Sequence, residues 1–173
     1  MLVFVGSNSS TSINKQLTLA VLNELNIQNE FIDLVKLDIP LFSQDLENEI
    51  GSPEGIKILM EAIQKHQNIF MTTNEHNQNI SAFFKNILDW LSRLDVKFLT
   101  GKKVFILSTS MGRRGALGAN ESLQNLSARF GCETIQTVAF PSFGENFDSE
   151  NQRILNSEIL NEISNKIQII LND

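Results

Sequence analysis

The sequence predicts an α/β fold built on a doubly wound, five-stranded parallel sheet with helices on both faces. Short apolar segments alternate along the chain with segments in which apolar residues recur every three or four positions, which is typical of strands followed by amphipathic helices. The strand segments are continuous apolar runs, as expected for strands buried on both faces, and parallel strands require crossover helices. With 173 residues, 42% of them hydrophobic, we expect one domain that spans residues 1–173.

The amino-terminal third is expected to contain two strands and one helix. An apolar run at residues 2–5 predicts the first strand, and a polar stretch follows it. Apolar residues at helical spacing then predict a helix over about residues 14–25. The second strand is expected at residues 31–35. Residues 36–52 contain Pro and Gly and are expected to form a long connection, a kind of segment that is often functional.

Two further helices and a strand follow. The segment Ser52-Pro53-Glu54 predicts a helix start, because Ser is a good N-cap and Pro is favoured at the first helical position. The third strand is expected at residues 68–73. Ser81 is expected to cap a helix that reaches residue 94. The apolar side chains of this helix cover more than one narrow stripe, which predicts contacts with both the sheet and a partner subunit.

The remaining elements complete the alternation. A fourth strand is expected at residues 104–107, and a Gly- and Ser-rich loop follows it over residues 108–118. The next helix is expected to end at Gly131, before a fifth strand at residues 134–140. Isoleucines and leucines at steps of three and four then predict a final covering helix over about residues 148–171.

Composition and charge exclude several classes of function. The net charge of −6 and the pI near 5.0 disfavour nucleic acid as a partner, because polyanion binding requires clustered Lys and Arg. The chain has no apolar run of membrane-spanning length. One cysteine, Cys132, allows no internal disulfide, and two isolated histidines make a metal site unexpected. The amino terminus lacks the pattern of a signal peptide, so we expect a cytoplasmic protein that binds no membrane.

Three polar loops are the candidate ligand site. In such sheets ligands bind outside the carboxyl ends of the strands at the topological switch point, which directs attention to residues 7–13, 74–80 and 109–118. The first loop brings five hydroxyl groups and free backbone N–H groups to the start of a helix, an arrangement that favours a phosphate. It matches neither the Walker loop nor the GxGxxG fingerprint. The alternative, that these Ser and Thr residues only cap a helix, is about equally consistent with this segment alone.

The second loop and the helix after it carry a resemblance to a known family. The run TNEHNQNISAFFKNILDWLSR, residues 73–93, resembles the signature T-P-E-Y-N-x-S-x-P-x-x-L-K-N-x-I-D-W of the NADPH-dependent FMN reductase family. The matching residues are Glu75, Asn77, Lys85, Asn86, Asp89 and Trp90. Weaker similarities lie at residues 6–14, 37–45 and 108–115, so the resemblance covers nearly the whole chain.

The resemblance implies a fold, a cofactor and a set of binding residues. The fold would be flavodoxin-like with strand order 2-1-3-4-5, and the cofactor would be FMN, reduced by NAD(P)H. The phosphate of FMN would be bound by Ser7, Ser9, Ser12, Ile13 and Asn14. The other cofactor-binding residues would be Asn74, Glu75, His76, Asn77, Ser110 and Gly112. The assembly would be a homodimer or a dimer of dimers.

The activity that the resemblance implies is an NAD(P)H-dependent FMN oxidoreductase. It would transfer hydride through FMN to a small acceptor, such as a flavin, quinone, azo compound or metal oxyanion, with no catalytic side chain because the flavin carries the chemistry. Two alternatives stay open: a flavodoxin-like electron carrier without nicotinamide turnover, and an interaction domain with a vestigial pocket. The chain has no tyrosine, and His76 stands where the family signature has one.

Overall fold

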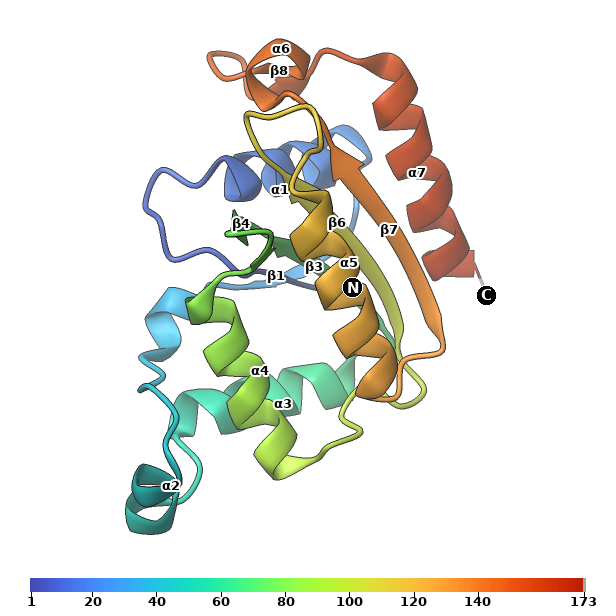
Figure 1. The fold of residues 1–173 in the computed structure, drawn as a ribbon. Coiled ribbons are helices and arrows are strands. Elements are labelled where there is room, and N and C mark those ends of the chain that lie inside the picture. Colours follow the sequence, from blue (N-terminus) through green and yellow to red (C-terminus); the bar gives the residue numbers. More distant parts are fainter. Residues whose placement is uncertain (173) are drawn as a thin grey trace.

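A five-stranded parallel sheet forms the centre of the molecule (Figure 1). In spatial order its strands are β2 (Glu30–Ile32), β1 (Leu2–Val5), β3 (Asn68–Thr73), β6 (Lys103–Thr109) and β7 (Thr134–Phe140). When the short hairpin strands outside this sheet are set aside, the order is 2-1-3-4-5. The predicted fold class is therefore confirmed. The structure is a computed structural model and describes residues 1–172.

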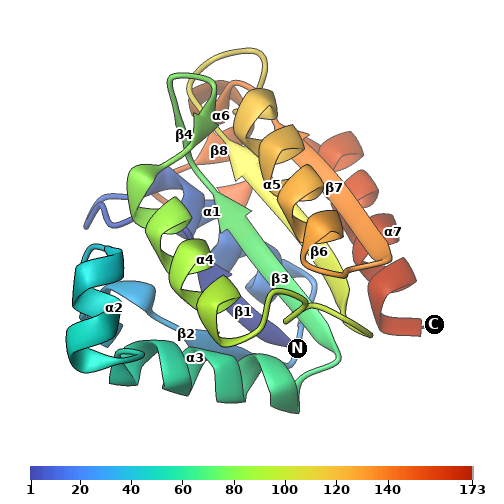
Figure 2. The ribbon, with the colours of Figure 1, turned by 60° about the horizontal axis from the view of Figure 1, so that its bottom comes forward.

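Helices cover both faces of the sheet (Figure 2). One face carries α1 (Ile13–Glu24) and α7 (Ser157–Asn172), and the other carries α3 (Glu54–Lys65), α4 (Ala82–Leu94) and α5 (Leu117–Arg129). Successive residues of β1 point to opposite faces, so Leu2 and Phe4 join one core and Val3 joins the other. This explains why β1 is apolar at every position. Within residues 1–172, no helix combines the length and the apolar character that crossing a membrane requires.

The wide apolar face of α4 is mostly buried by the chain itself. Phe84, Ile87 and Trp90 are fully buried in the core. The indole nitrogen Nε1 of Trp90 donates to the carbonyl oxygen of Pro40 at 2.9 Å, and its ring meets that of Phe42 edge to face. Only the margin of this face is therefore left for contact with a partner subunit.

The predicted second strand and the connection after it need correction. The strand ends at Ile32, because Asp33 Oδ1 accepts the backbone N–H of Val35 and starts the 3-10 helix η1 (Leu34–Leu37). The connection contains a short helix, α2 (Gln44–Ile50), which Ser43 caps by accepting the N–H of Leu46. These two caps are local signals, and each ends a segment of extended chain.

Two helix starts also differ from prediction. Helix α3 has Pro53 as its N-cap residue and no side-chain cap, so Ser52 does not cap it. The final helix α7 begins at Ser157 rather than near residue 148, because Asn156 Oδ1 accepts the N–H groups of Glu158 and Ile159. The residues before α7 form the short helix α6 (Phe143–Asn146) and a hairpin of β8 (Phe147–Asp148) and β9 (Arg153–Ile154).

Candidate functional site

The three loops expected at the switch point line one cavity. It has a volume of about 270 Å³ and lies at the carboxyl ends of β1, β3 and β6. We call it the switch-point cavity. Nine of the residues predicted to bind the cofactor line it: Ser7, Ser9, Ser12, Ile13, Asn14, Asn74, Glu75, His76 and Ser110. Thr11, Thr109 and Met111 line it as well and were missed, although each is next to a predicted position or lies inside a predicted loop.

The loop between β1 and α1, which we call the first loop, is held by its own hydroxyl groups. Ser12 Oγ caps α1 by accepting the N–H of Lys15 at 3.2 Å. Ser9 Oγ lies 3.3 Å from Thr11 Oγ1 and also accepts the N–H of Thr11. The first N–H groups of a helix have no partner within it, and nothing in residues 1–172 accepts those of Ile13 and Asn14. They remain available to an anion at the positive end of the helix dipole.

Asn14 joins the first loop to the strand β6. Its side chain is buried and makes two hydrogen bonds to the backbone of Thr109: Nδ2 donates to the carbonyl oxygen at 3.2 Å, and the N–H of Thr109 donates to Oδ1 at 3.0 Å. Both polar groups of the side chain are therefore occupied by protein. Asn14 lines the cavity, but only its backbone N–H is free to bind a ligand.

The second loop is a tight hairpin. Its strands are β4 (Glu75–His76) and β5 (Asn79–Ile80), and the two turn residues Asn77 and Gln78 have positive φ angles of 52° and 61°. Such angles are those of a type I′ turn, whose right-handed twist matches paired strands. The hairpin was missing from the predicted elements because Gln is an unusual residue at the second turn position.

Glu75 holds this hairpin against α5. Its Oε2 accepts the backbone N–H of Ala119 at 3.0 Å, in the first turn of the helix, where a negative charge is favourable. The hairpin approaches so closely that a Cβ at Gly118 would lie 2.8 Å from the carbonyl oxygen of Gln78. Glu75 therefore serves as a helix cap across the cavity wall, which leaves one carboxylate oxygen for any further contact.

Replacing Glu75 with alanine is expected to lower the free energy of unfolding by about 1–2 kcal/mol, because the N–H of Ala119 loses a charged acceptor. Glu75→Gln keeps an acceptor oxygen and should lose less. Chemical denaturation measures the stability, and hydrogen exchange should show faster opening at Ala119. Glu121→Ala, an exposed glutamate of the same helix, is the control. Equal stability and exchange for Glu75→Ala and this control would contradict the capping role.

Asn74 and His76 form the wall of the cavity nearest the hairpin. Asn74 Nδ2 lies 3.2 Å from His76 Nε2, a contact that orients the imidazole ring. Asn74 Oδ1 is buried and has no hydrogen-bond donor among residues 1–172. A buried acceptor without a donor costs about 1–3 kcal/mol, so this atom favours a ligand that donates a hydrogen bond.

Two predicted residues lie outside the switch-point cavity. Asn77 lines an adjoining cavity of about 630 Å³ between α4 and α5, and the two cavities share His76. The carbonyl oxygen of Gly112 accepts the N–H groups of Gly115 and Ser142 and thereby shapes the loop after β6. The two cavities together offer more room than the first alone.

Several residues of the matched motif support structure rather than a ligand. Asn86 Nδ2 donates to the carbonyl oxygen of Pro40, and Asn86 Oδ1 accepts the N–H of Phe42 at 2.7 Å. Trp90 donates to the same carbonyl of Pro40. These contacts fasten the connection after η1 to α4.

Cys132 is not a reactive group. It is buried, its Sγ lies 3.3 Å from the carbonyl oxygens of Lys102 and Thr134, and burial raises the pKa of the thiol to about 11. At pH 8 the thiol is protonated, and the thiolate is the nucleophile.

We therefore expect iodoacetamide at pH 8 to leave Cys132 of the native protein unmodified over a time in which the denatured chain is fully alkylated. Mass spectrometry of the intact protein measures the modification, and the urea-denatured chain is the control. Equal rates in the two states would show that the thiol is accessible and ionised in the fold.

The fold and the site define a flavodoxin-like α/β protein with a ligand cavity at the topological switch point. The chain belongs to the NADPH-dependent FMN reductase family, whose family model matches residues 1–145. This confirms the family that the sequence motif indicated.

Individual relatives agree with this membership. A quinone reductase of Escherichia coli (strain K12) is 36% identical over 89 residues, which are 51% of this chain and 47% of that protein. A 2-hydroxy-1,4-benzoquinone reductase of Burkholderia sp is 33% identical over 129 residues, 73% of this chain and 68% of that protein. The match thus spans about half the length of the first relative.

Solved structures share the fold at low identity. FerB, a flavoenzyme NAD(P)H:(acceptor) oxidoreductase from Paracoccus denitrificans, superposes with a TM-score of 0.79 at 23% identity and covers 99% of this chain and 94% of its own. An FMN-dependent NADH-azoreductase from Bacillus anthracis str. Ames Ancestor, in complex with FMN, gives 0.69 at 14% identity and covers 99% of each chain. These similarities establish the fold alone.

Proposed function

We propose that the chain is an NAD(P)H-dependent FMN oxidoreductase that delivers electrons to a small acceptor such as a flavin, quinone, azo compound or metal oxyanion. The observation that carries this proposal is the switch-point cavity, in which a helix start with free N–H groups adjoins a wall with an unpaired buried acceptor. Membership of the FMN reductase family supports it.

The residues present fit FMN. A phosphate fits the first loop, where the N–H groups of Ile13 and Asn14 and the hydroxyls of Ser7, Ser9 and Ser12 surround the start of α1. Among residues 1–172, no Lys or Arg lines this cavity, so backbone N–H groups and hydroxyls would hold the anion. Asn74 Oδ1 fits a donor group of a heterocycle. The proposed binding residues are Ser7, Ser9, Ser12, Ile13, Asn14, Asn74, His76 and Ser110, and Asn77 would contribute from the adjoining cavity.

The protein would contribute binding and positioning rather than a catalytic side chain. When bound, FMN supplies the hydride acceptor and the electron donor. Ser7 and Ser12 would hold one end of the ligand at the helix dipole. Asn74 and His76 would orient the other end, and Glu75, through its bond to Ala119, would keep both in place. Met111, which is 67% exposed at the rim, offers a flexible apolar side chain to an incoming acceptor.

The test is anaerobic mixing of the FMN-loaded protein with NADH and, separately, with NADPH. Rapid bleaching of the flavin absorbance, followed by reoxidation on addition of a quinone, is expected. Flavin that binds but stays oxidised with both nicotinamides would favour the electron carrier. A purified protein that is colourless and does not bind added FMN would contradict both the oxidoreductase and the electron carrier. It would favour an interaction domain with a vestigial pocket.

We also propose a cytoplasmic homodimer or dimer of dimers. Exposed apolar side chains near α2 and α4 support a partner surface, among them Leu41 at 78%, Val96 at 61% and Leu94 at 41% exposure. Size-exclusion chromatography with light scattering at micromolar concentration tests it, and a monomer would overturn it.

A further inference from the structure

A second cavity lies on the other side of the first loop. It has a volume of about 330 Å³ and is bounded by the carboxyl ends of β1 and β2, by α1 and by the start of η1. We call it the β2-side cavity. Ser7 and Ser9 line both this cavity and the switch-point cavity, so the two share one wall. Its volume is in the range of sites that bind a small organic ligand.

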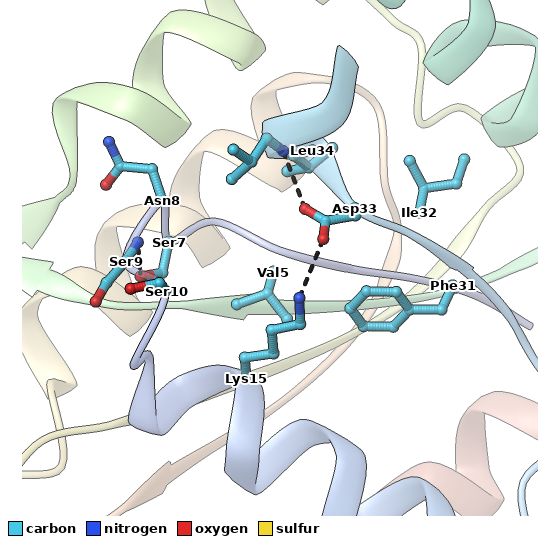
Figure 3. A pocket seen from close by; sticks show the side chains of 11 residues that line it. Val5, Ser7, Asn8, Ser9, Ser10, Lys15, Phe31, Ile32, Asp33 and Leu34 are labelled. Atoms are coloured by element: carbon cyan, nitrogen blue, oxygen red, sulfur yellow. Dashed lines mark hydrogen bonds and ion pairs between the residues drawn. The ribbon is translucent and has the colours of Figure 1, made fainter. Parts of the chain in front are cut away.

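An ion pair crosses the middle of the β2-side cavity (Figure 3). Lys15 Nζ, from α1, lies 3.1 Å from Asp33 Oδ2, at the end of β2, and the two side chains are 41% and 28% exposed. An ammonium group has three donor hydrogens and a carboxylate accepts several hydrogen bonds, so the pair has donors and acceptors left over. Burial raises the pKa of Asp33, but the hydrogen bonds from Lys15 and from the N–H of Val35 outweigh it and hold this pKa below its ordinary value. The carboxylate is thus ionised at neutral pH.

The two sides of the ion pair differ in polarity. The ring of Phe31 lies on one side of the ion pair, and Ser9 and Ser10 of the first loop lie on the other side, beyond Val5 (Figure 3). A ligand that fits must combine a flat apolar group, hydroxyls for the carboxylate, and an anion for Lys15 and the serines. A nucleoside monophosphate has these three parts in this order.

We propose that the β2-side cavity binds the adenosine monophosphate half of NADH, with the ribose hydroxyls on Asp33, the phosphate on Lys15 and Ser10, and the base against Phe31. A carboxylate at the end of the second strand that binds a ribose 2′-hydroxyl is a known arrangement in dinucleotide-binding α/β sheets of different topology. The shared wall places this half next to the switch-point cavity. The assignment of this nucleotide site rests on the proposed oxidoreductase function only for the identity of the nucleotide.

The direct test is binding of 5′-AMP to the FMN-saturated protein, followed by the backbone amide signals in NMR spectra. Saturating FMN occupies the switch-point cavity, so 5′-AMP should shift the amides of Asn8, Ser10 and Asp33. Lys15→Met should raise the Kd for 5′-AMP about tenfold or more, because a charge-assisted hydrogen bond is lost. Lys57→Met is the matched control: Lys57 also pairs with a carboxylate, that of Glu54 at 3.5 Å, but on α3. No shift of these amides at millimolar 5′-AMP overturns the proposal.

The role of Asp33 is tested with 2′-deoxyadenosine 5′-monophosphate. The wild type should bind the deoxynucleotide several-fold more weakly than 5′-AMP, and Asp33→Asn should reduce that difference. Asn keeps the size of Asp and can still accept the N–H of Val35, so the fold is expected to survive. Equal affinity of the wild type for the two nucleotides would show that Asp33 does not bind the 2′-hydroxyl.

Kinetics separate this proposal from the proposed function. Lys15→Met should raise the KM for NADH about tenfold and leave kcat and the Kd of FMN unchanged, because a uniform binding contact is removed. If the protein oxidises the nicotinamide nucleotide but its β2-side cavity does not bind 5′-AMP, the proposed site is refuted and the proposed function stands. A protein that binds 5′-AMP there but no FMN refutes the proposed function and keeps the site, since Lys15 and Asp33 do not line the switch-point cavity.

Discussion

Replacing Asn14 with alanine is expected to lower the free energy of unfolding by about 2–4 kcal/mol. The change leaves the buried N–H and C=O of Thr109 without partners, and each orphaned group costs about 1–3 kcal/mol. It also unlinks the first loop from β6, so FMN should bind at least tenfold more weakly. Urea denaturation measures the first effect, and quenching of flavin fluorescence measures the second.

Two further variants sharpen this result. Asn14→Asp keeps an acceptor for the N–H of Thr109 but sets a second carboxylate oxygen against the carbonyl oxygen of Thr109. It should be unstable at neutral pH and recover in part as the pH falls, because the protonated carboxyl regains a donor. Asn23→Ala, an exposed position of the same helix, controls for helix propensity. If Asn14→Ala were as stable as Asn23→Ala, the two hydrogen bonds between Asn14 and the backbone of Thr109 would contribute nothing to stability.

Replacing Gly6 with alanine is expected to destabilise the fold by about 3 kcal/mol. A Cβ at this position would lie 2.2–2.8 Å from three ring atoms of Phe84, and this ring is fully buried against Phe4 with no free space to enter. The carbonyl oxygen of Gly6 also accepts the hydroxyl of Ser81, the N-cap of α4. Displacing Gly6 should therefore disturb both the first loop and the start of α4, and weaken FMN binding as well as stability.

The control for this prediction is Gly112→Ala. A Cβ there would meet only Ser110 Oγ, at 3.7 Å, so the stability should change by less than about 1 kcal/mol. Phe84→Leu combined with Gly6→Ala should cost less than the sum of the two single changes, because the smaller side chain relieves the clash. Additive effects in this double-mutant cycle would argue against the steric cause.

The strands and most helices were predictable because the signal that specifies them is local. Leu2 to Val5 is apolar at every position because each face of β1 meets a core, and the same burial marks β3 and β6. The ends of elements were less predictable. Asp33 and Asn156 each turn the chain by accepting backbone N–H groups a few residues further on. The spacing of apolar residues, from which the elements were predicted, gives no sign of such a bond.

The location of the candidate site was predictable, while the roles of its residues were not. Parallel strands bring their carboxyl ends together, so the loops after β1, β3 and β6 had to meet at one edge. Asn14, however, bonds to Thr109, 95 residues away, and Glu75 bonds to Ala119, 44 residues away. Both were predicted as cofactor-binding residues, and the structure shows that their side chains mainly hold the cavity wall.

Three features could be read from the amino-acid order alone: the alternation of strands and helices, the edge of the sheet where a ligand is expected, and the family motif, including His76 in a chain without tyrosine. Which polar groups stay free for that ligand depends on the folded chain. A buried polar group takes whichever partner the fold brings within about 3 Å. Distant segments supply those partners, so Asn14 and Glu75 are engaged by protein, whereas Asn74 Oδ1 and the first N–H groups of α1 remain free.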